Sequence, residues 1–351
     1  MKNITFFTVH QAPHNTYIFK SIEKKCHLEI FYLQEKLKDY GWKSADFFYP
    51  GKIDTNLITY IKSAFKSDLV IINGWNNYRY IVLILLLLIT NHKFAFQFDF
   101  NITSLKRFRI IKKTLLKKIP FLLITGVYGE RFLKKYLRTQ NIFDFPYGIE
   151  MVNIEKVNMI NKEREMAIDK GDQIRVFISN RFIERKGYHL VHSLIRYLKQ
   201  QNNLYNFQFT IAGNGPLLEK FRNSISLIDH DIVFLGWIDY TKYRENILSC
   251  DIYLHCSEFE PYGIPPVDAL VCKKEIVVTS KIYSKFDLLD LGGYVHEFNY
   301  KKEIELFRIF NKFTTNRQDI YKSNKLIKLD SNSKYLFCSR HTKALNEMLK
   351  D

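Results

Sequence analysis

The sequence has no long apolar run of the kind that crosses a membrane. Its most lipid-like stretch is Ile81–Ile89, nine residues, whereas a helix needs about 20 to span a bilayer. The opening MKNITFFTVHQ has one lysine and a short apolar stretch, which predicts a strand and not a signal peptide. We therefore expect Ile81–Ile89 to form a buried helix. The protein itself is expected in the cytoplasm, either soluble or peripheral on the inner face of the plasma membrane.

Cysteine is also scarce in this chain. Its 351 residues include five cysteines, an odd number, and no two of them form a CxxC pair. In a chain of this size, that usage favours reduced thiols over a disulfide framework. There is also no His/Cys cluster with metal-ligand spacing, so no metal site is expected.

Acidic residues are few relative to basic ones. Asp and Glu number 36 against 53 Lys and Arg, which leaves a formal charge of +17. Such an excess favours polyanionic partners: nucleic acid, anionic lipid or phosphorylated small molecules. The basic residues are dispersed and no nucleic-acid-binding module is recognisable, so nucleic acid is not expected as a partner.

Short apolar runs recur along the chain and predict two sets of strands. The first set is expected at 4–9, 69–73, 94–98 and 122–125, and the second at 175–179, 207–212, 232–235, 252–255 and 276–279. Helical patterns lie between them, the clearest being the 3.6-residue stripe of Leu190, Val191, Leu194, Ile195 and Leu198. Alternating strands and helices predict an α/β protein with parallel, doubly wound sheets. A polar, weakly periodic stretch at 150–171 separates the two sets and marks the expected domain boundary.

The stretch SEFEPYGIPPVDAL, residues 257–270, carries two carboxylates, Glu260 and Asp268, around a glycine and two prolines. Gly263 permits a turn with positive φ, and proline suits the first turn of a helix. A strand, a loop and a helix N-terminus are therefore expected here, with Asp268 within about the first helical turn. Such a terminus attracts phosphate, and a carboxylate beside it can accept hydrogen bonds from ribose or sugar hydroxyls. The alternative is that Asp268 only complements the helix dipole and Glu260 is a solvated loop acid.

Two further loops follow strands of the second set. ISNRFIERKGYHL places Arg181 and Lys186 after a strand and Gly187 before a helix, an arrangement suited to a diphosphate. FTIAGNGPLLEKF has Gly213 and Gly215 in a strand-to-helix turn. Each has a plainer interpretation, a solvated basic loop in the first case and a tight turn in the second.

In this order and spacing, these stretches resemble the retaining GT-B glycosyltransferases of the glycosyltransferase family 4 type, glycosyl transferases group 1. The matched elements lie at about 175–280: Arg181, Lys186–Gly187, Gly213–Pro216, VFLGW at 233–237, and the segment from Glu260 to Asp268. The resemblance implies two Rossmann-like domains facing each other across a cleft. It implies an acceptor-binding domain at 1–165, completed by a helix at 334–351, and a nucleotide-sugar-binding domain at 172–333.

The resemblance also implies a role for each matched residue. Glu260 would contact the donor sugar as a catalytic residue, and Asp268 the nucleotide ribose. The implied donor-binding set is Arg181, Lys186, Gly213, Gly215, Tyr262, Gly263, Ile264 and Asp268, with the amides of 262–264 on the phosphates. The family usually has glutamate where this chain has Asp268. The shorter side chain leaves its reach to the ribose open.

The N-terminal half offers weaker candidates. His10 and His14 follow the first strand and are candidate acceptor-binding residues; an ordinary loop with incidental histidines is the alternative. In FAFQFDFN the residues alternate between two faces, and Asp99 stands near the end of the expected strand, where crevice residues belong. Relatives carry a polar residue in this region near the reacting sugar, so Asp99 is a second catalytic candidate.

Ser104–Pro120 holds seven Lys or Arg residues beside a helical apolar stripe. It is either a surface helix packed on the sheet or a contact with an anionic membrane surface. The resemblance implies retaining transfer of a sugar from a UDP- or GDP-linked donor to a glycan or lipid-linked acceptor. No metal or other cofactor is implied, and bacterial cell-surface polysaccharide synthesis, such as lipopolysaccharide or capsule, is the expected setting. A nucleotide-sugar epimerase or hydrolase on the same fold, and a non-catalytic scaffold homologue, stay open as alternatives.

Overall fold

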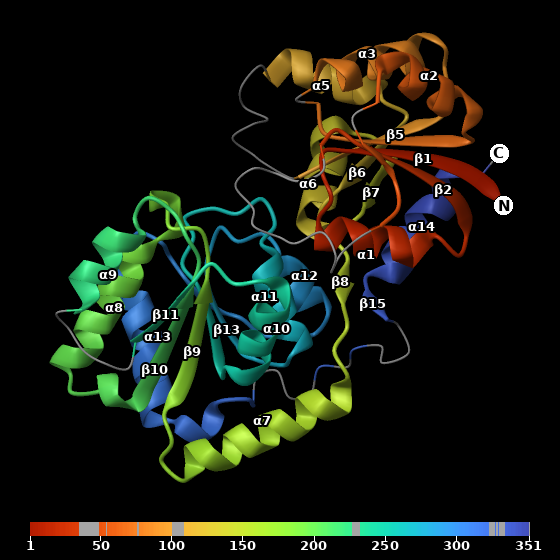
Figure 1. The fold of residues 1–351 in the computed structure, drawn as a ribbon. Coiled ribbons are helices and arrows are strands. Elements are labelled where there is room, and N and C mark those ends of the chain that lie inside the picture. Colours follow the sequence, from red (N-terminus) through yellow and green to blue (C-terminus); the bar gives the residue numbers. More distant parts are fainter. Residues whose placement is uncertain are drawn as a thin grey trace. The chain divides into compact units, whose positions relative to one another are not determined.

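The computed structural model describes residues 1–34, 49–53, 55–75, 77–99, 109–226, 232–322, 327, 329 and 334–350, and for 109–112 and 319 the backbone alone. The chain divides into two compact units, Met1–Glu150 with Ser333–Asp351, and Met151–Asn332 (Figure 1). The division falls earlier than the expected domain end at 165. The reason is that α7 (Ile154–Asp169) is bonded into the second unit, where Asn161 donates to the carbonyl of Cys272 and Arg164 to the carboxylate of Asp251.

The first unit is built on a parallel sheet with strand order β3-β2-β1-β4-β5-β6-β7. Its strands are β1 (Lys2–Thr8), β2 (Cys26–Tyr32), β3 (Lys52–Ile53), β4 (Leu69–Asn73), β5 (Phe94–Phe98), β6 (Phe121–Ile124) and β7 (Ile142–Asp144). A short antiparallel pair, β8 (Ile149–Glu150) with β15 (Tyr335–Leu336), ties the C-terminal segment to this unit. The strands expected from the sequence are confirmed here to within two residues at their ends.

Helices cover both faces of this sheet (Figure 1). α1 (Pro13–Ile22) and α14 (Cys338–Met348) lie on one face, where Ile18, Leu345 and Met348 join the apolar core. α2 (Leu57–Lys66), α3 (Tyr78–Ile89) and α5 (Arg109–Lys118) lie on the other. α6 (Val127–Leu137) packs beside α5 and β7.

The expectation of a buried helix at Ile81–Ile89 is wrong for half of α3. One face, with Tyr80, Leu83, Ile84 and Leu87, is buried against the sheet. The opposite face is exposed, and the side chain of Ile89 is 81% accessible. An outer helix needs apolar residues on one stripe only, so apolar content alone could not show which side is covered. No helix among the described residues has the length and apolar character needed to cross a membrane.

The second unit has a parallel sheet with strand order β11-β10-β9-β12-β13-β14. Its strands are β9 (Ile174–Ser179), β10 (Phe207–Ala212), β11 (Ile232–Gly236), β12 (Ile252–His255), β13 (Glu275–Thr279) and β14 (His296–Phe298). All five strands expected in this half are present, and β14 is additional. The predicted α/β class with two doubly wound parallel-sheet domains is therefore confirmed.

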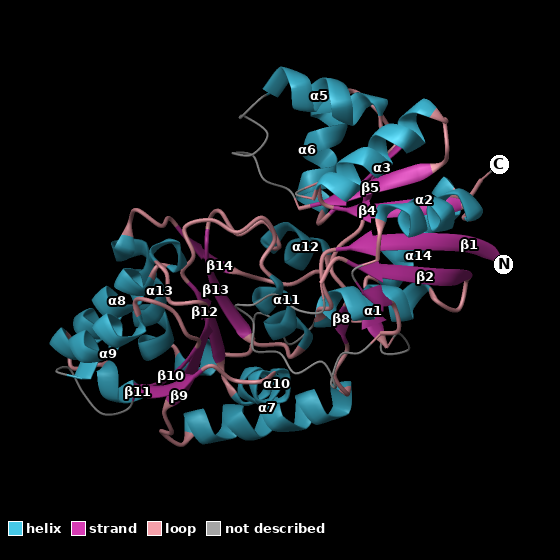
Figure 2. Cartoon of the chain, turned by 45° about the horizontal axis from the view of Figure 1, so that its top comes forward, coloured by secondary structure: helices cyan, strands magenta, loops and turns pink. Residues whose placement is uncertain are grey.

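Helices also flank this sheet on both faces (Figure 2). α8 (Tyr188–Gln200), α9 (Leu218–Ser226) and α13 (Glu303–Thr315) pack on one face over a core that includes Leu194 and Phe310. α10 (Tyr240–Ser249), α11 (Ile264–Val271) and α12 (Lys285–Asp290) lie on the other. The chain winds from β9 toward β11 in one direction and from β12 toward β14 in the other. The strand order thus reverses between β9 and β12, and ligands of open α/β sheets bind at the carboxyl ends of such a strand pair.

Candidate functional site

The loop after β9 is held tightly against the end of β12. Gly187 takes a left-handed conformation, with φ 71°, between a short 3-10 turn, Glu184–Lys186, and α8. A Cβ placed on Gly187 would overlap the carbonyl oxygen of Cys256, so only glycine lets the two loops meet this closely. The amide of Glu258 donates to the carbonyl of Arg185, 2.7 Å away. Lys186 is therefore fixed beside the residues that follow β12.

The predicted glycine turn after β10 supports the same loop. Gly213 has φ 135° and Gly215 φ 153°, and a Cβ on Gly215 would lie 2.6 Å from the carbonyl oxygen of Phe182. A Cβ on Gly213 would overlap the carbonyl oxygen of Asn180. The amide of Phe182 in turn donates to the carbonyl of Asn214, at 2.9 Å. These glycines therefore allow the loop that carries Arg181 to pack closely against the end of β10.

Glu260 is a buried residue and not a solvated loop acid; its side chain is 10% accessible. Its Oε1 accepts from the ammonium of Lys186, and its Oε2 lies 3.7 Å from a guanidinium nitrogen of Arg185. The Glu260 backbone is held by a bridge to Ile282 on the segment after β13. Lys186 and Glu260, 74 positions apart in sequence, are thus joined at the point where the strand order reverses.

His255, the last residue of β12, completes the surroundings of Glu260. Its ring is 1% accessible, and its Nε2 lies 3.5 Å from Glu260 Oε1 and 3.2 Å from Ser257 Oγ. Its Nδ1 faces the amide nitrogen of Asn180 at 3.3 Å. An amide NH₂ only donates, so Nδ1 accepts and the ring proton sits on Nε2, directed at Ser257 and Glu260.

Burial and charge act in opposite directions on these groups. Burial raises the pKa of Glu260, but the hydrogen bond from His255 and the charge of Lys186 outweigh it, and the net pKa falls below the ordinary range. Burial lowers the pKa of Lys186 although Glu260 opposes the change. Burial also lowers the pKa of His255, which leaves the ring neutral at pH 7. The centre is therefore a carboxylate held by one ammonium and one neutral imidazole.

α11 begins beside this centre. Gly263, with φ 96°, precedes its first residue, Ile264, and prolines occupy its first turn. The first amides of a helix have no acceptor within the helix, and because Pro265 and Pro266 have no N–H, this end presents the amides of Ile264 and Val267 with a partial positive charge. Tyr262 is buried, and its carbonyl accepts from the amide of Ser284 at 2.9 Å, which fixes the turn before Gly263.

Asp268 is the fifth residue of α11, just past the first turn, which contains no acidic residue, so it lies close to its expected position. Its Oδ1 accepts from Arg244 at 2.8 Å and its Oδ2 from the hydroxyl of Tyr243 at 2.9 Å, both on α10. Burial raises the pKa of Asp268, against the lowering effect of Arg244 and Tyr243. The side chain is 1% accessible, and Arg244 and Tyr243 occupy its two oxygens.

Arg181 is the most accessible of the predicted donor residues. It lies on the loop between β9 and the 3-10 turn and is exposed. The structure therefore brings together Arg181, Lys186, Glu260 and the start of α11 at one edge of one sheet, as the motif spacing predicted.

In the first unit, Asp99 and His14 both contact Tyr147. Asp99 Oδ1 accepts from the Tyr147 hydroxyl at 2.7 Å and from Thr125 Oγ1 at 3.0 Å. The ring of His14, in α1, packs edge-on against Tyr147 with the centroids 4.4 Å apart. Burial, with His10 nearby, lowers the pKa of His14 to about 3, so the ring is neutral. His10, which follows β1, keeps a buried Nδ1 without a hydrogen-bond partner.

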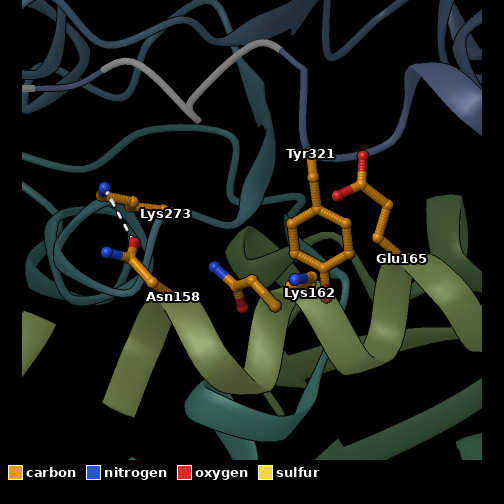
Figure 3. Close-up of a pocket in the computed structure, with 6 residues that line it drawn as sticks. Asn158, Lys162, Glu165, Lys273 and Tyr321 are labelled. Carbon is orange, nitrogen blue, oxygen red and sulfur yellow. Dashed lines mark hydrogen bonds between the residues drawn. The ribbon is translucent and has the colours of Figure 1, made fainter. Parts of the chain in front are cut away.

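A separate cleft of about 420 Å³ lies elsewhere in the second unit (Figure 3). Asn158, Lys162 and Glu165 of α7 line it, with Lys273 and Tyr321. Lys273 stands just before β13, so this cleft lies at the amino ends of the strands, opposite the predicted donor residues. Lys273 donates to Asn158 at 3.0 Å across it.

Sequence reasoning missed several residues of the site. His255 was included in an expected strand but given no role, and Arg185 stands inside the Arg181–Lys186 motif without having been singled out. Tyr147 was given no role, and its link to Asp99 depends on a contact across 48 positions. A buried polar residue at a strand's carboxyl end is the signal that could have identified His255.

Two parallel-sheet Rossmann-like domains, with a cation-bearing loop and a buried carboxylate at one strand-order reversal, define the GT-B class of fold. The family model of glycosyl transferases group 1 matches residues 159–307. The match covers the part of the chain that carries the motifs, and the resemblance to glycosyl transferases group 1 expected from them is confirmed over it.

Individual relatives agree with that assignment. An uncharacterized glycosyltransferase of Methanocaldococcus jannaschii, MJ1607, is 24% identical over 131 residues, 37% of this chain and 33% of that protein. The chain thus spans about a third of this curated relative's length. Anabaena Alr3699/HepE, solved with UDP and glucose, superposes with a TM-score of 0.73 at 14% identity over 99% of both chains. The lipopolysaccharide outer core galactosyltransferase WaaB gives 0.66 at 11% identity over 98% of this chain and 99% of its own. At such identities the superpositions show the fold alone.

Proposed function

We propose that this protein is a glycosyltransferase that moves a sugar from a nucleotide-diphosphate donor to an acceptor. The observation that carries the proposal is the Lys186–Glu260 pair at the strand-order reversal of a glycosyl transferases group 1 domain, with Arg181 on the same loop. The structure of Alr3699/HepE contains UDP and glucose, which supports a nucleotide-sugar donor for this chain as well.

The site suits the departure of a diphosphate. Negative charge develops on the leaving phosphate as the glycosidic bond breaks, and preorganised donors stabilise it. Arg181, Lys186 and the first amides of α11 are the groups proposed to do so. Lys186 already holds Glu260, so an arriving phosphate shares its ammonium with that carboxylate. Glu260 is then proposed to accept hydrogen bonds from sugar hydroxyls while Lys186 and His255 both hold its Oε1.

The proposal also includes the stereochemistry of transfer, the donor, the acceptor and a membrane contact. The transfer retains the anomeric configuration and needs no metal, and the donor is UDP- or GDP-linked. Asp99, His10 and His14 contribute to the acceptor side. The acceptor is a glycan or lipid-linked saccharide of a bacterial cell-surface polysaccharide, a setting supported by the likeness to the fold of WaaB. Ser104–Pro120 contacts anionic lipid on the inner face of the plasma membrane; residues 104–108 of it lie outside the described part of the chain.

A thermal-shift panel of UDP, GDP, ADP, TDP and CMP, each with EDTA and with magnesium, tests the donor site. A ligand that binds only the folded state raises the melting temperature by mass action. One diphosphate should stabilise the wild type and fail to stabilise Arg181→Ala, a change at an exposed residue that leaves the Lys186–Glu260 pair intact. Lys170→Ala/Arg196→Ala, which removes two exposed cations elsewhere in the second unit, is the control for net charge.

The outcomes separate the alternatives. A diphosphate that raises the melting temperature of the wild type but not that of Arg181→Ala supports the donor site. Turnover of the matching nucleotide sugar without any acceptor would indicate a hydrolase or epimerase. If no diphosphate stabilises the protein, the donor site is refuted and the non-catalytic scaffold takes its place.

A further inference from the structure

Helix α3 exposes an aliphatic stripe that the sugar-transfer proposal does not use. Tyr78, Ile81, Leu85 and Ile89 recur at spacings of three and four residues, so they share one face of the helix. Their accessible fractions are 65, 46, 48 and 81%. The opposite face of α3 is buried on the sheet, so the residues of this stripe do not contribute to the apolar core.

The neighbouring helix α2 extends the apolar surface. α2 and α3 are in contact, and Ile58 and Phe65 of α2 are 64% and 41% accessible. Monomeric soluble proteins rarely expose large contiguous apolar patches, and such patches mark interaction sites. We define the α2–α3 face as Ile58, Phe65, Tyr78, Ile81, Leu85 and Ile89.

The charged residues of the helices that form and flank this face are all basic. The helices α2, α3 and α5, which lie on the same side of the sheet (Figure 1), contain no Asp or Glu in their 10, 12 and 10 residues. They contain Lys62, Lys66, Arg79, Arg109, Lys112, Lys113, Lys117 and Lys118. Lys62, Lys66, Lys117 and Lys118 are exposed. Of the described acids near these helices, Asp68 accepts from the amide of Asn3, and Glu29 pairs with Lys52 and also lies close enough to Lys66 of α2 to feel its charge.

We propose that the α2–α3 face lies on an anionic lipid bilayer, with its aliphatic side chains inserted at the headgroup boundary and the lysines of α2 and α5 over the lipid phosphates. An apolar stripe flanked by cations is the pattern that binds such a surface. A second copy of the chain fits less well. A two-fold interface pairs a patch with itself, which would set these cations against one another.

The proposal adds a surface to the contact suggested for Ser104–Pro120 and is independent of sugar transfer. Its test is sedimentation with vesicles of phosphatidylcholine alone and of phosphatidylcholine with phosphatidylglycerol. The wild type should bind the anionic vesicles, more weakly as salt rises, and bind the neutral ones much less. Ile81→Ser/Leu85→Ser/Ile89→Ser should lower the partition by roughly tenfold or more, because each side chain loses apolar surface that the lipid would bury.

The three substituted residues are exposed, so the fold should survive, and the melting temperature checks this. Met159→Ser/Met166→Ser/Ile304→Ser removes exposed apolar side chains of the second unit, 55, 51 and 49% accessible, and should bind as the wild type does. Lys62→Gln/Lys66→Gln/Lys117→Gln/Lys118→Gln should abolish the preference for anionic vesicles.

Three results would overturn the proposal. The first is a wild type that is absent from the pellet with both kinds of vesicle, and the second is an α3 variant that sediments like the wild type. The third is a dimer by light scattering that the α3 variant dissociates, which would make this face an interface between copies. None of these measurements involves nucleotide. A negative result would therefore refute membrane binding without affecting the donor-site proposal, which the thermal-shift panel tests.

Discussion

Replacing Gly187 by alanine should loosen the loop that carries Lys186. Two costs add at this position. A non-glycine residue with left-handed backbone costs about 1–2 kcal/mol, and overpacking a tight contact costs about 1–3 kcal/mol. The new methyl would overlap the carbonyl of Cys256, and both backbones are held by hydrogen bonds, so neither moves freely. We expect a loss of about 2–5 kcal/mol in the free energy of unfolding of the second unit.

Gly292 offers a matched control. Its φ is 78°, close to the 71° of Gly187, yet a Cβ placed on it would meet no atom within 4 Å. Gly292→Ala therefore carries only the backbone cost, about 1–2 kcal/mol, less the gain of about 0.4–1 kcal/mol from a stiffer unfolded chain. The difference between the two variants measures the contact with Cys256 alone.

Urea unfolding followed by tryptophan fluorescence and far-UV circular dichroism compares the two variants, and nucleotide binding is measured under native conditions. Gly187→Ala should unfold earlier than Gly292→Ala and bind the selected diphosphate more weakly, because Lys186 shifts with the loop. Equal losses of stability would refute the argued contact. A large stability loss with unchanged diphosphate affinity would refute its link to the donor site.

Further predictions concern the buried charged groups. Glu260→Gln should cost about 3–5 kcal/mol at neutral pH because it leaves a buried ammonium unpaired. The folded pKa of Glu260 lies below its ordinary 4.5, so this cost should shrink as the pH of the unfolding assay falls below 4.5; a pH-independent cost would contradict the pairing. Asp268→Asn should lower stability yet leave the ratio of affinities for UDP and 2′-deoxy-UDP unchanged in calorimetry, whereas a reduced ratio would demonstrate a ribose contact. His255→Gln, which keeps a donor toward Glu260, should retain more turnover than His255→Met at similar melting temperatures, and equal turnover would remove its positioning role. Arg164→Met should cost about 3–5 kcal/mol in unfolding because the buried carboxylate of Asp251 loses its counter-charge and keeps only neutral donors, with no change in diphosphate affinity.

The nine expected strands and the loops after them were predictable because each depends on local sequence, whereas β2, β7 and β14 were not predicted. Runs such as Leu69–Asn73 and Phe207–Ala212 are apolar because both faces of a parallel sheet are covered, and the structure begins and ends β4 and β10 at those residues. Glycines and prolines then mark where each strand gives way to a helix. Two-residue strands such as Lys52–Ile53 are too short to carry any periodicity, so they were missed.

The pairings within the site were not predictable in the same way. The spacing of Arg181 and Lys186 placed both after one strand, but nothing local says that Lys186 meets Glu260 or that Asp268 meets Arg244. These contacts join segments far apart in the chain and depend on which strands are neighbours. The exposed side of α3 was hidden for a similar reason, since both of its faces are apolar and only the packing distinguishes them.

The first unit is discontinuous, and this has a consequence for how the chain is made. α14 supplies Leu345 and Met348 to the core beneath β1, but the ribosome synthesises it only after the whole of Met151–Asn332. The second unit has all its strands available while the first still lacks a helix over one face. During synthesis the N-terminal sheet, although made first, should therefore mature last, and a chain that terminates before Ser333 should keep a folded second unit beside an N-terminal sheet that remains open to chaperones and proteases.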